Sequence, residues 1–159
     1  ILIANAYFLP GRKLRKALTT AARRGVKVQI LLQGRYEYFM QFYASRAVYA
    51  ELLAAGVQIY EYQASFLHAK VAVIDGHWAT VGSSNLDPLS LLLAREANVV
   101  IDDAAFADKM HACITHALAH SSKGVDAEAL GTRSLRERVR ERLALGLMRL
   151  ALLLTRNRY

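Results

Sequence analysis

Residues 68–85, HAKVAVIDGHWATVGSSN, combine two short apolar segments with side chains that can bind and attack a phosphoryl group. His68 and Lys70 are two residues apart in a segment of strand character, so both side chains project from one face of a sheet. A lysine among apolar strand residues is costly to bury unless that face opens into a cleft that binds an anion. Ser83 and Asn85 follow the second segment and supply a hydroxyl and an amide. Together these groups suit a tetrahedral oxyanion such as phosphate.

The chemistry of these groups indicates a role for each. The imidazole of His68 can attack phosphorus and form a covalent intermediate, which splits one displacement into two. Lys70 and Asn85 would hold the non-bridging oxygens and stabilise the charge of the transition state. We expect no metal and no cofactor. His116 and His120 are four residues apart on an expected helix but lack a third ligand, so we interpret them as part of a solvated helix face.

These side chains need a framework of strands and helices to position them. Apolar patterning predicts strands over 1–10, 26–32, 57–62, 69–75, 77–82 and 96–101, and helices over 11–24, 46–55 and 104–120. Strand–helix alternation followed by hairpins predicts an α/β fold, a mixed β-sheet with helices packed on both faces. We expect a catalytic half-domain over 1–120, a linker over 121–132 and a basic amphipathic helix over 133–159.

The positive charge is concentrated in the tail. The formal net charge is +8, and residues 131–159 hold eight arginines against two glutamates, a balance of +6. On a helical wheel the leucines of the tail, among them Leu143 and Leu147, share one side, and Arg138, Arg142 and Arg149 lie beside them. This pattern favours a helix lying in an anionic membrane interface, and its apolar runs are too short to span a bilayer. The alternative is packing against a missing N-terminal half, or a dimer contact.

The chemistry-bearing residues also match a known pattern. Every fixed position of H-x-K-x4-D-x6-G-S-x-N is satisfied, by His68, Lys70, Asp75, Gly82, Ser83 and Asn85. The chain therefore resembles the phospholipase D superfamily, whose HKD motif has this form, and Glu96 matches the acidic residue that follows it. NAYFLP, AARRGVKVQILL, YAELLAAGVQIYEY and NLDPLSL resemble bacterial cardiolipin synthases, especially the shorter B-type. The resemblance covers roughly residues 1–120.

The resemblance implies specific roles for the matched residues. The catalytic residues would be His68 as the nucleophile, Lys70, Asp75 in support, Asn85 and Glu96, and the phosphate would be bound by Lys70, Ser83 and Asn85. In this family two motifs make one site, and the partner histidine is the general acid. This chain has one motif and begins with Ile1 rather than methionine, so it looks like the C-terminal half, nearly inactive alone. Ala94 stands where these synthases often have asparagine.

The function expected from this resemblance is phosphatidyl transfer. A membrane-associated cardiolipin synthase would take the phosphatidyl group from phosphatidylglycerol onto His68, working peripherally at the cytoplasmic side of a bacterial inner membrane. Its partners would be the membrane surface and either the missing half or a homodimer mate. The alternative is a homodimeric phosphodiesterase acting on nucleic acid, which is disfavoured because the basic residues gather on an apolar-faced helix. A non-catalytic lipid-binding module would not need the histidine.

Structural interpretations compete with the functional ones at several positions. Asp75 precedes a glycine, which favours a hairpin turn over a catalytic position. For Glu96, an ion pair at the edge of the core is the less favoured alternative. The aromatic segment 36–43 fits internal packing or the lining of a lipid entrance. Cys113, the only cysteine, is expected to be a small buried residue in a reducing compartment.

Overall fold

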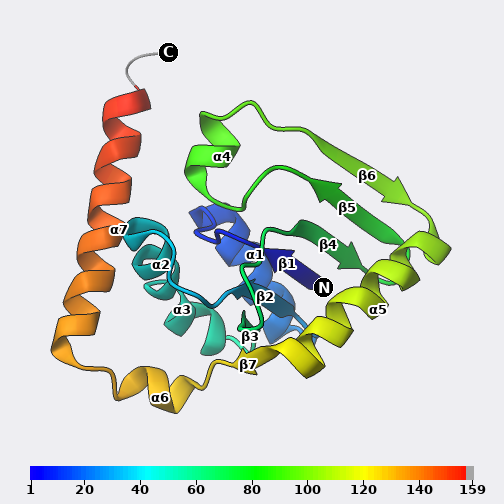
Figure 1. The fold of residues 1–159 in the computed structure, drawn as a ribbon, viewed down its shortest axis with the longest axis horizontal. Helices are drawn as coiled ribbons and strands as arrows, with labels where there is room; N and C mark the ends of the chain where they lie inside the picture. The colour runs from blue at the N-terminus through cyan, green and yellow to red at the C-terminus, as the bar shows by residue number, and fades with distance from the viewer. Residues whose placement is uncertain (157–159) are drawn as a thin grey trace.

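A single mixed β-sheet forms the centre of the molecule (Figure 1). The computed structural model describes the backbone of residues 1–156 and the side chains of residues 1–153. The strands lie in the order β6-β5-β4-β1-β2-β3-β7. Their bounds are β1 Leu2–Asn5, β2 Gln29–Gln33, β3 Gln58–Tyr62, β4 Lys70–Ile74, β5 Trp78–Gly82, β6 Asn98–Asp102 and β7 Ser122–Gly124. Strands β1, β2 and β3 are mutually parallel and the other pairings are antiparallel, which confirms the predicted mixed sheet.

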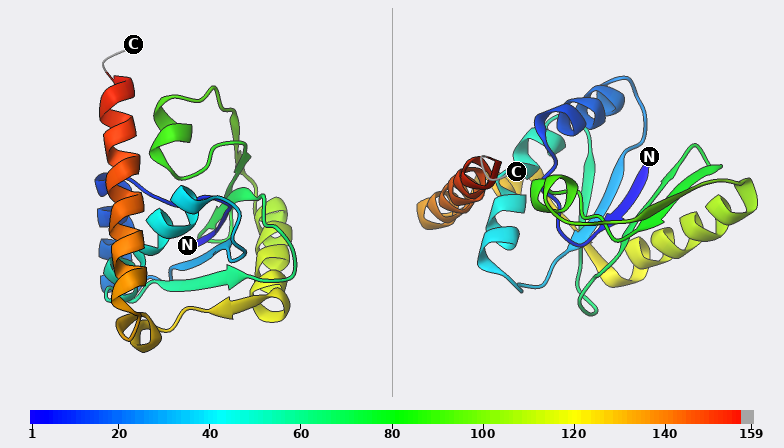
Figure 2. Two further views of the ribbon diagram at one scale, coloured as in Figure 1. Left: turned by 60° about the vertical axis from the view of Figure 1, so that its left-hand side comes forward. Right: turned by 90° about the horizontal axis from the view of Figure 1, so that it is seen from above.

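Helices cover both faces of this sheet (Figure 2). Their bounds are α1 Arg12–Arg23, α2 Phe39–Arg46, α3 Tyr49–Leu53, α4 Pro88–Leu92, α5 Ala104–Ser121, α6 Ala127–Gly131 and α7 Leu135–Arg156. Side chains from α1, α2, α3 and α7 join the core on one face, and α5 packs on the other. The predicted α/β fold with helices on both faces is therefore confirmed.

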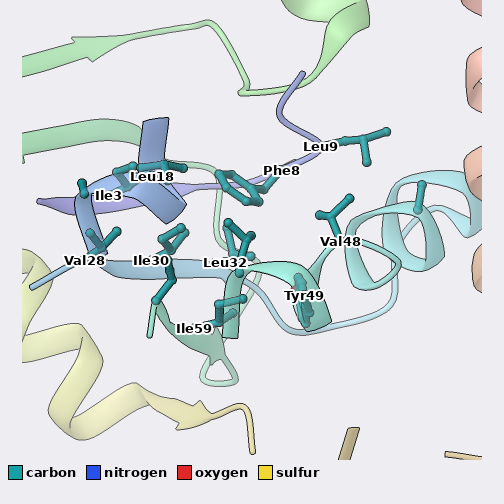
Figure 3. Packing of buried hydrophobic residues seen from close by; sticks show 14 of the residues in the cluster. Ile3, Phe8, Leu9, Leu18, Val28, Ile30, Leu32, Val48, Tyr49 and Ile59 are labelled. Carbon is teal, nitrogen blue, oxygen red and sulfur yellow. The ribbon is translucent and has the colours of Figure 1, made fainter. Parts of the chain in front are cut away.

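The alternation of side chains along the strands divides the core into two layers. In β2, Ile30 and Leu32 point into the cluster that contains Phe8 and Tyr49, and Figure 3 shows these side chains stacked between the sheet and the helices. Leu31, between them in sequence, points to the opposite face, where it meets Ile114 of α5. A strand buried on both faces reads as a continuous apolar run, as VQILL does here.

Two glycines end helices and turn the chain into the next strand. Gly25 follows α1 and Gly56 follows α3, and both have φ of +91°. Their backbone amides donate to carbonyls of the last helical turn. An L-residue with a side chain is strained in this conformation, so glycine is the natural residue at these helix ends.

The structure differs from the sequence-based expectations in several places. Residues 121–132, predicted as a linker, form β7, which pairs with β3, and α6. The first strand ends at Asn5, because the chain then leaves the ladder and Phe8 bridges to Leu86. Cys113 is exposed and not buried. The tail helix begins at Leu135, two residues later than predicted, and the predicted residues 157–159 lie outside the described part.

Candidate active site

The β4–β5 hairpin places His68 and Lys70 at one end and Asp75 at the other. Lys70 is the first residue of β4 and the exposed His68 lies just before it. Asp75 and Gly76 make the tight turn, with φ of +53° and +73°, so the predicted hairpin turn is confirmed. At a rise of about 3.3 Å per residue, Asp75 is roughly 16 Å along the strand from Lys70.

Lys70 is a nearly buried cation at the site. Its side chain is 8% exposed, and Nζ donates to the backbone carbonyl of His68 at 3.1 Å. Burial lowers the pKa of the Lys70 ammonium, while the carboxylates of Glu96 and Glu37 act in the opposite direction. The ammonium therefore has two acidic neighbours and a donor position close to the histidine backbone. Glu96 itself is exposed, which does not fit the alternative of a core-edge ion pair.

Asn85 is held at both ends of its amide. Its Oδ1 accepts from the backbone N–H of Tyr7 at 3.2 Å, and its Nδ2 donates to Ser90 Oγ at 3.4 Å. Ser90 Oγ in turn donates to Asp87 Oδ2 at 3.1 Å, and all three side chains are buried. Asp87 is the N-cap of α4 and accepts from the backbone N–H groups of Leu89 and Ser90. The sequence Asp-Pro at a helix start thus fixes the orientation of the amide.

The loop between β5 and α4 packs closely against the start of β6. A Cβ on Gly82 would stand 1.9 Å from Asn98 Oδ1 and 2.5 Å from the carbonyl oxygen of Ala97, so no larger residue fits. Asn98 Nδ2 donates to Ser84 Oγ at 2.7 Å, which gives the motif's variable serine a structural partner. Ser83 Oγ accepts from the Ala97 backbone N–H at 3.1 Å, and it donates to the same residue's carbonyl at 3.4 Å. Ser83 therefore anchors the segment that carries Glu96.

Two site residues were missed by the sequence analysis, Tyr7 and Glu37. Asn5 pairs with Lys70 in the β1–β4 register and the Ala6 amide bonds to the Ala69 carbonyl, so Tyr7 follows directly on this pairing, and its backbone N–H donates to Asn85 Oδ1. Tyr7 Oη donates to Glu37 Oε2 at 2.7 Å, and burial together with this carboxylate raises the pKa of the phenol. The signal in the sequence is faint, since Glu37 is the single acid within the aromatic segment 36–43.

The aromatic segment forms a cluster next to these residues. Tyr36 packs edge-on against Phe42, with ring centroids 5.2 Å apart, and Phe39 lies 4.9 Å from Tyr43. Tyr38 reaches back to Tyr7 at 6.2 Å, which ties the cluster to the active-site end of β1. The internal packing predicted for this segment is present, and several of its rings are also solvent-exposed, namely Tyr36, Tyr38 and Phe39.

Metal binding finds no support among the described residues. No group of three or more His, Cys, Asp or Glu side chains there is arranged to hold an ion. His116 and His120 stack with ring centroids 4.3 Å apart and are exposed on α5. His77, in the hairpin, is bonded to Asp102 at 2.7 Å, away from His68.

Fold and motif together define a phospholipase D-like domain. Residues 1–118 match the family described as cardiolipin synthase, PLD-like domain. The chain belongs to this family of PLD-like domains. It is 46% identical over 134 residues to cardiolipin synthase B of Salmonella typhi and 45% identical to that of Escherichia coli K12, in each case covering 84% of this chain and 32% of the relative. The chain therefore spans about a third of the length of these curated relatives.

Solved structures with this fold extend the comparison to the tail. Phosphatidylserine synthase of Haemophilus influenzae superposes with a TM-score of 0.69 at 13% identity, and the match covers 99% of this chain and 40% of that one. Nuc of Salmonella typhimurium, a phospholipase D family member, superposes with a TM-score of 0.64 at 20% identity, covering 77% of this chain and 79% of that one. The fold is thus that of the phospholipase D family.

Proposed function

We propose that this chain is one catalytic half of a cardiolipin synthase-type phosphatidyltransferase. The observation that carries the proposal is the site itself. His68 lies beside a nearly buried ammonium, with a doubly anchored Asn85 on the adjoining loop. The family match and the identity to cardiolipin synthases B support phosphatidylglycerol as the donor and a lipid hydroxyl as the acceptor.

Transfer would proceed in two balanced displacements. In the first, an imidazole nitrogen of His68 attacks phosphorus, an N–P bond forms, and the P–O bond to the departing glycerol breaks. The leaving oxygen takes a proton from the general acid of the partner motif. In the second, the acceptor hydroxyl gives its proton to that same group and attacks phosphorus, and the N–P bond breaks. Both steps place negative charge on the non-bridging oxygens of the phosphoryl group.

Lys70 and Asn85 would stabilise that charge. The amide nitrogen of Asn85 carries two hydrogens, and Ser90 accepts one of them, so the second is a donor for a phosphate oxygen. Burial lowers the pKa of Lys70 because it removes water from the ammonium. A bound phosphate would replace that water with an anion and so stabilise the charged form of the lysine. Ser83 fits better as a positioning residue for the Glu96 segment than as a phosphate ligand, because its hydroxyl already bonds Ala97.

The remainder of the active site would come from a second HKD motif outside these residues. This chain holds one motif and spans about a third of its curated relatives, which supports a partner motif within the same longer protein. A lipid substrate places the reaction at a bilayer, which we propose is the cytoplasmic side of a bacterial inner membrane. In the part of the chain that is described, no helix is long and apolar enough to cross a membrane.

The test uses the full-length protein and captures the covalent intermediate. Incubation with phosphatidylglycerol labelled in its phosphate, followed by rapid denaturation at alkaline pH, is expected to leave label on His68. His68→Ala is expected to lose the adduct and at least about a thousandfold in cardiolipin formation. His77→Ala is the matched control, because His77 is an exposed histidine of the same hairpin. Retained transfer in His68→Ala would overturn the proposal, and cleavage of single-stranded DNA without lipid transfer would favour the nuclease.

A further inference from the structure

Helix α7 has two apolar faces, and only one of them packs on the protein. Ala144 and Met148 are fully buried in the main core, and Leu145 packs partly against it. Figures 1 and 2 show α7 along one side of the molecule, with α2 on its inner side. Glu141 lies on the same inner face and is paired with Arg133, which links the helix to the segment between α6 and α7. This inner face accounts for the fixed position of α7.

The second face is a stripe of large apolar side chains that the described residues leave uncovered. We call it the α7 leucine stripe, and its members are Leu135, Val139, Leu143, Leu147, Leu150 and Leu153. Each is between 43% and 78% exposed. Spaced by three or four residues, they fall within about 120° of the helix circumference, opposite Ala144 and Met148. The stripe is about 27 Å long at 1.5 Å per residue.

Arginines border the stripe and carboxylates are kept away from it. At 100° per residue, Arg138, Arg142 and Arg149 fall along one border, and Arg140 falls along the other. Arg136 falls within the stripe itself, in its first helical turn. All five arginines are exposed. The two glutamates of α7 are engaged on the far side, Glu137 with Ser134 at the helix start and Glu141 with Arg133. A largely apolar stripe flanked by arginines, without acidic residues, is complementary to an anionic surface with an apolar interior.

We propose that the α7 leucine stripe is a docking surface for an anionic lipid bilayer. The helix lies in the interface, its leucines enter the boundary between headgroups and acyl chains, and its arginines contact lipid phosphates. The inference rests on the proposed function only in that a phosphatidyl-transferring enzyme must reach lipid in a membrane. A second copy of the chain would be a poor occupant, because a symmetric contact through the stripe would bring the arginine rows of both copies together.

The test compares vesicle binding of full-length variants. The stripe variant, Leu143→Glu with Leu147→Glu, is set against a control with the same added charge, Ala112→Glu with Ala119→Glu, on the exposed side of α5. We expect the wild type and the control to float with vesicles containing phosphatidylglycerol, and far less with phosphatidylcholine alone. The stripe variant should lose at least about tenfold in bound fraction. Equal flotation of the stripe variant would overturn the proposal.

A labelling experiment shows what covers the stripe without relying on a charged variant. In a Cys113→Ser background, Leu147→Cys should react with a water-soluble maleimide in solution and become protected by phosphatidylglycerol vesicles. Protection without vesicles would mean that the rest of the protein, or a second copy, covers the stripe, and would overturn the proposal. Light scattering distinguishes these two occupants.

An assay with a monomeric, water-soluble lipid tests the proposed function independently of the docking surface. Short-chain dihexanoyl phosphatidylglycerol below its micelle concentration needs no docking surface, so the stripe variant should turn it over at the wild-type rate. A wild type that floats but transfers from neither donor would refute the proposed function and leave the docking surface standing. A stripe variant that still floats while both proteins transfer would refute the docking surface alone.

Discussion

Replacing Ser90 with alanine isolates the positioning of Asn85 from its chemistry. Ser90 Oγ sits between the two buried groups, accepting from Asn85 Nδ2 and donating to Asp87 Oδ2. The substitution removes both bonds and leaves the other anchor of Asn85, the backbone N–H of Tyr7, in place. The amide is then free to rotate about one remaining contact, so its free hydrogen no longer points consistently at the phosphoryl oxygen.

The size of the effect follows from these contacts. The bond to Asn85 is long at 3.4 Å and joins neutral groups, so it contributes about 0.5 kcal/mol. The bond to the Asp87 carboxylate at 3.1 Å contributes about 1.5 kcal/mol, so the free energy of unfolding should fall by about 2 kcal/mol. Loss of a complete oxyanion donor costs about 2.7–4 kcal/mol in the transition state. Losing one of two anchors should cost about half of the lower figure, about 1.4 kcal/mol, or tenfold in kcat.

The assay measures kcat, KM and thermal unfolding on the full-length protein for three variants. Ser90→Ala should lower kcat about tenfold with a smaller change in KM, since the amide acts mainly in the transition state. Ser90→Thr keeps the hydroxyl and should restore most of the rate. Ser122→Ala is the stability control, because it removes a bond of 2.7 Å to the Leu118 carbonyl far from the site. An unchanged kcat in Ser90→Ala, or an equal loss in Ser122→Ala, would refute the positioning argument.

Two further predictions concern the charge on Lys70 and the packing of Gly82. Because burial lowers the pKa of Lys70 and Glu96 opposes that shift, phosphate binding should weaken at alkaline pH, as the ammonium loses its proton below the range of a free lysine. Glu96→Gln should move this alkaline limb of the kcat/KM profile to lower pH, and an unmoved limb would mean that the carboxylate does not act on Lys70. Gly82→Ala should destabilise the protein by about 2–3 kcal/mol through the overlap with Asn98, measured by thermal unfolding. A Cβ on Gly146, an exposed residue of α7, would have nothing within 4 Å, so Gly146→Ala should instead stabilise the protein by about 0.5–1 kcal/mol. Similar melting temperatures of both variants would contradict the packing argument.

The sequence predicted those parts of the site that depend on local geometry. The hairpin brings the His68 backbone carbonyl within hydrogen-bond distance of Lys70 Nζ, and Asp75–Gly76 turns because both residues adopt positive φ. The same geometry removes Asp75 from the phosphate site, since the motif spans the whole length of β4. The residues of one sequence motif therefore have different roles in the structure. His68 and Lys70 lie at one end of the β4–β5 hairpin, and Asp75 forms the turn at its other end.

What the sequence could not predict depends on contacts between distant segments. Tyr7 reaches Asn85 only through the placement of β1 beside β4, and Glu37 joins the site only through its bond to Tyr7. The short strand β7 has weak strand formers, Ser-Lys-Gly, and exists because the edge of β3 offers unpaired backbone groups.

The tail helix is the clearest case of a pattern that needed a fold for its interpretation. On a helical wheel, Leu145 and Met148 fall outside the apolar side that contains Leu143 and Leu147, so the sequence alone does not show a single clean apolar face. In the structure, Leu145 and Met148 lie on an inner face of α7 that packs on the core. Leu143 and Leu147 lie on an outer, exposed face. A helix that only packed on its own domain would need the inner face alone. One that only floated on a membrane would need the outer face alone. A helix with both faces packs on the PLD-like domain while presenting leucines outward, so in our proposal the surface that those leucines enter has a defined orientation relative to the candidate active site.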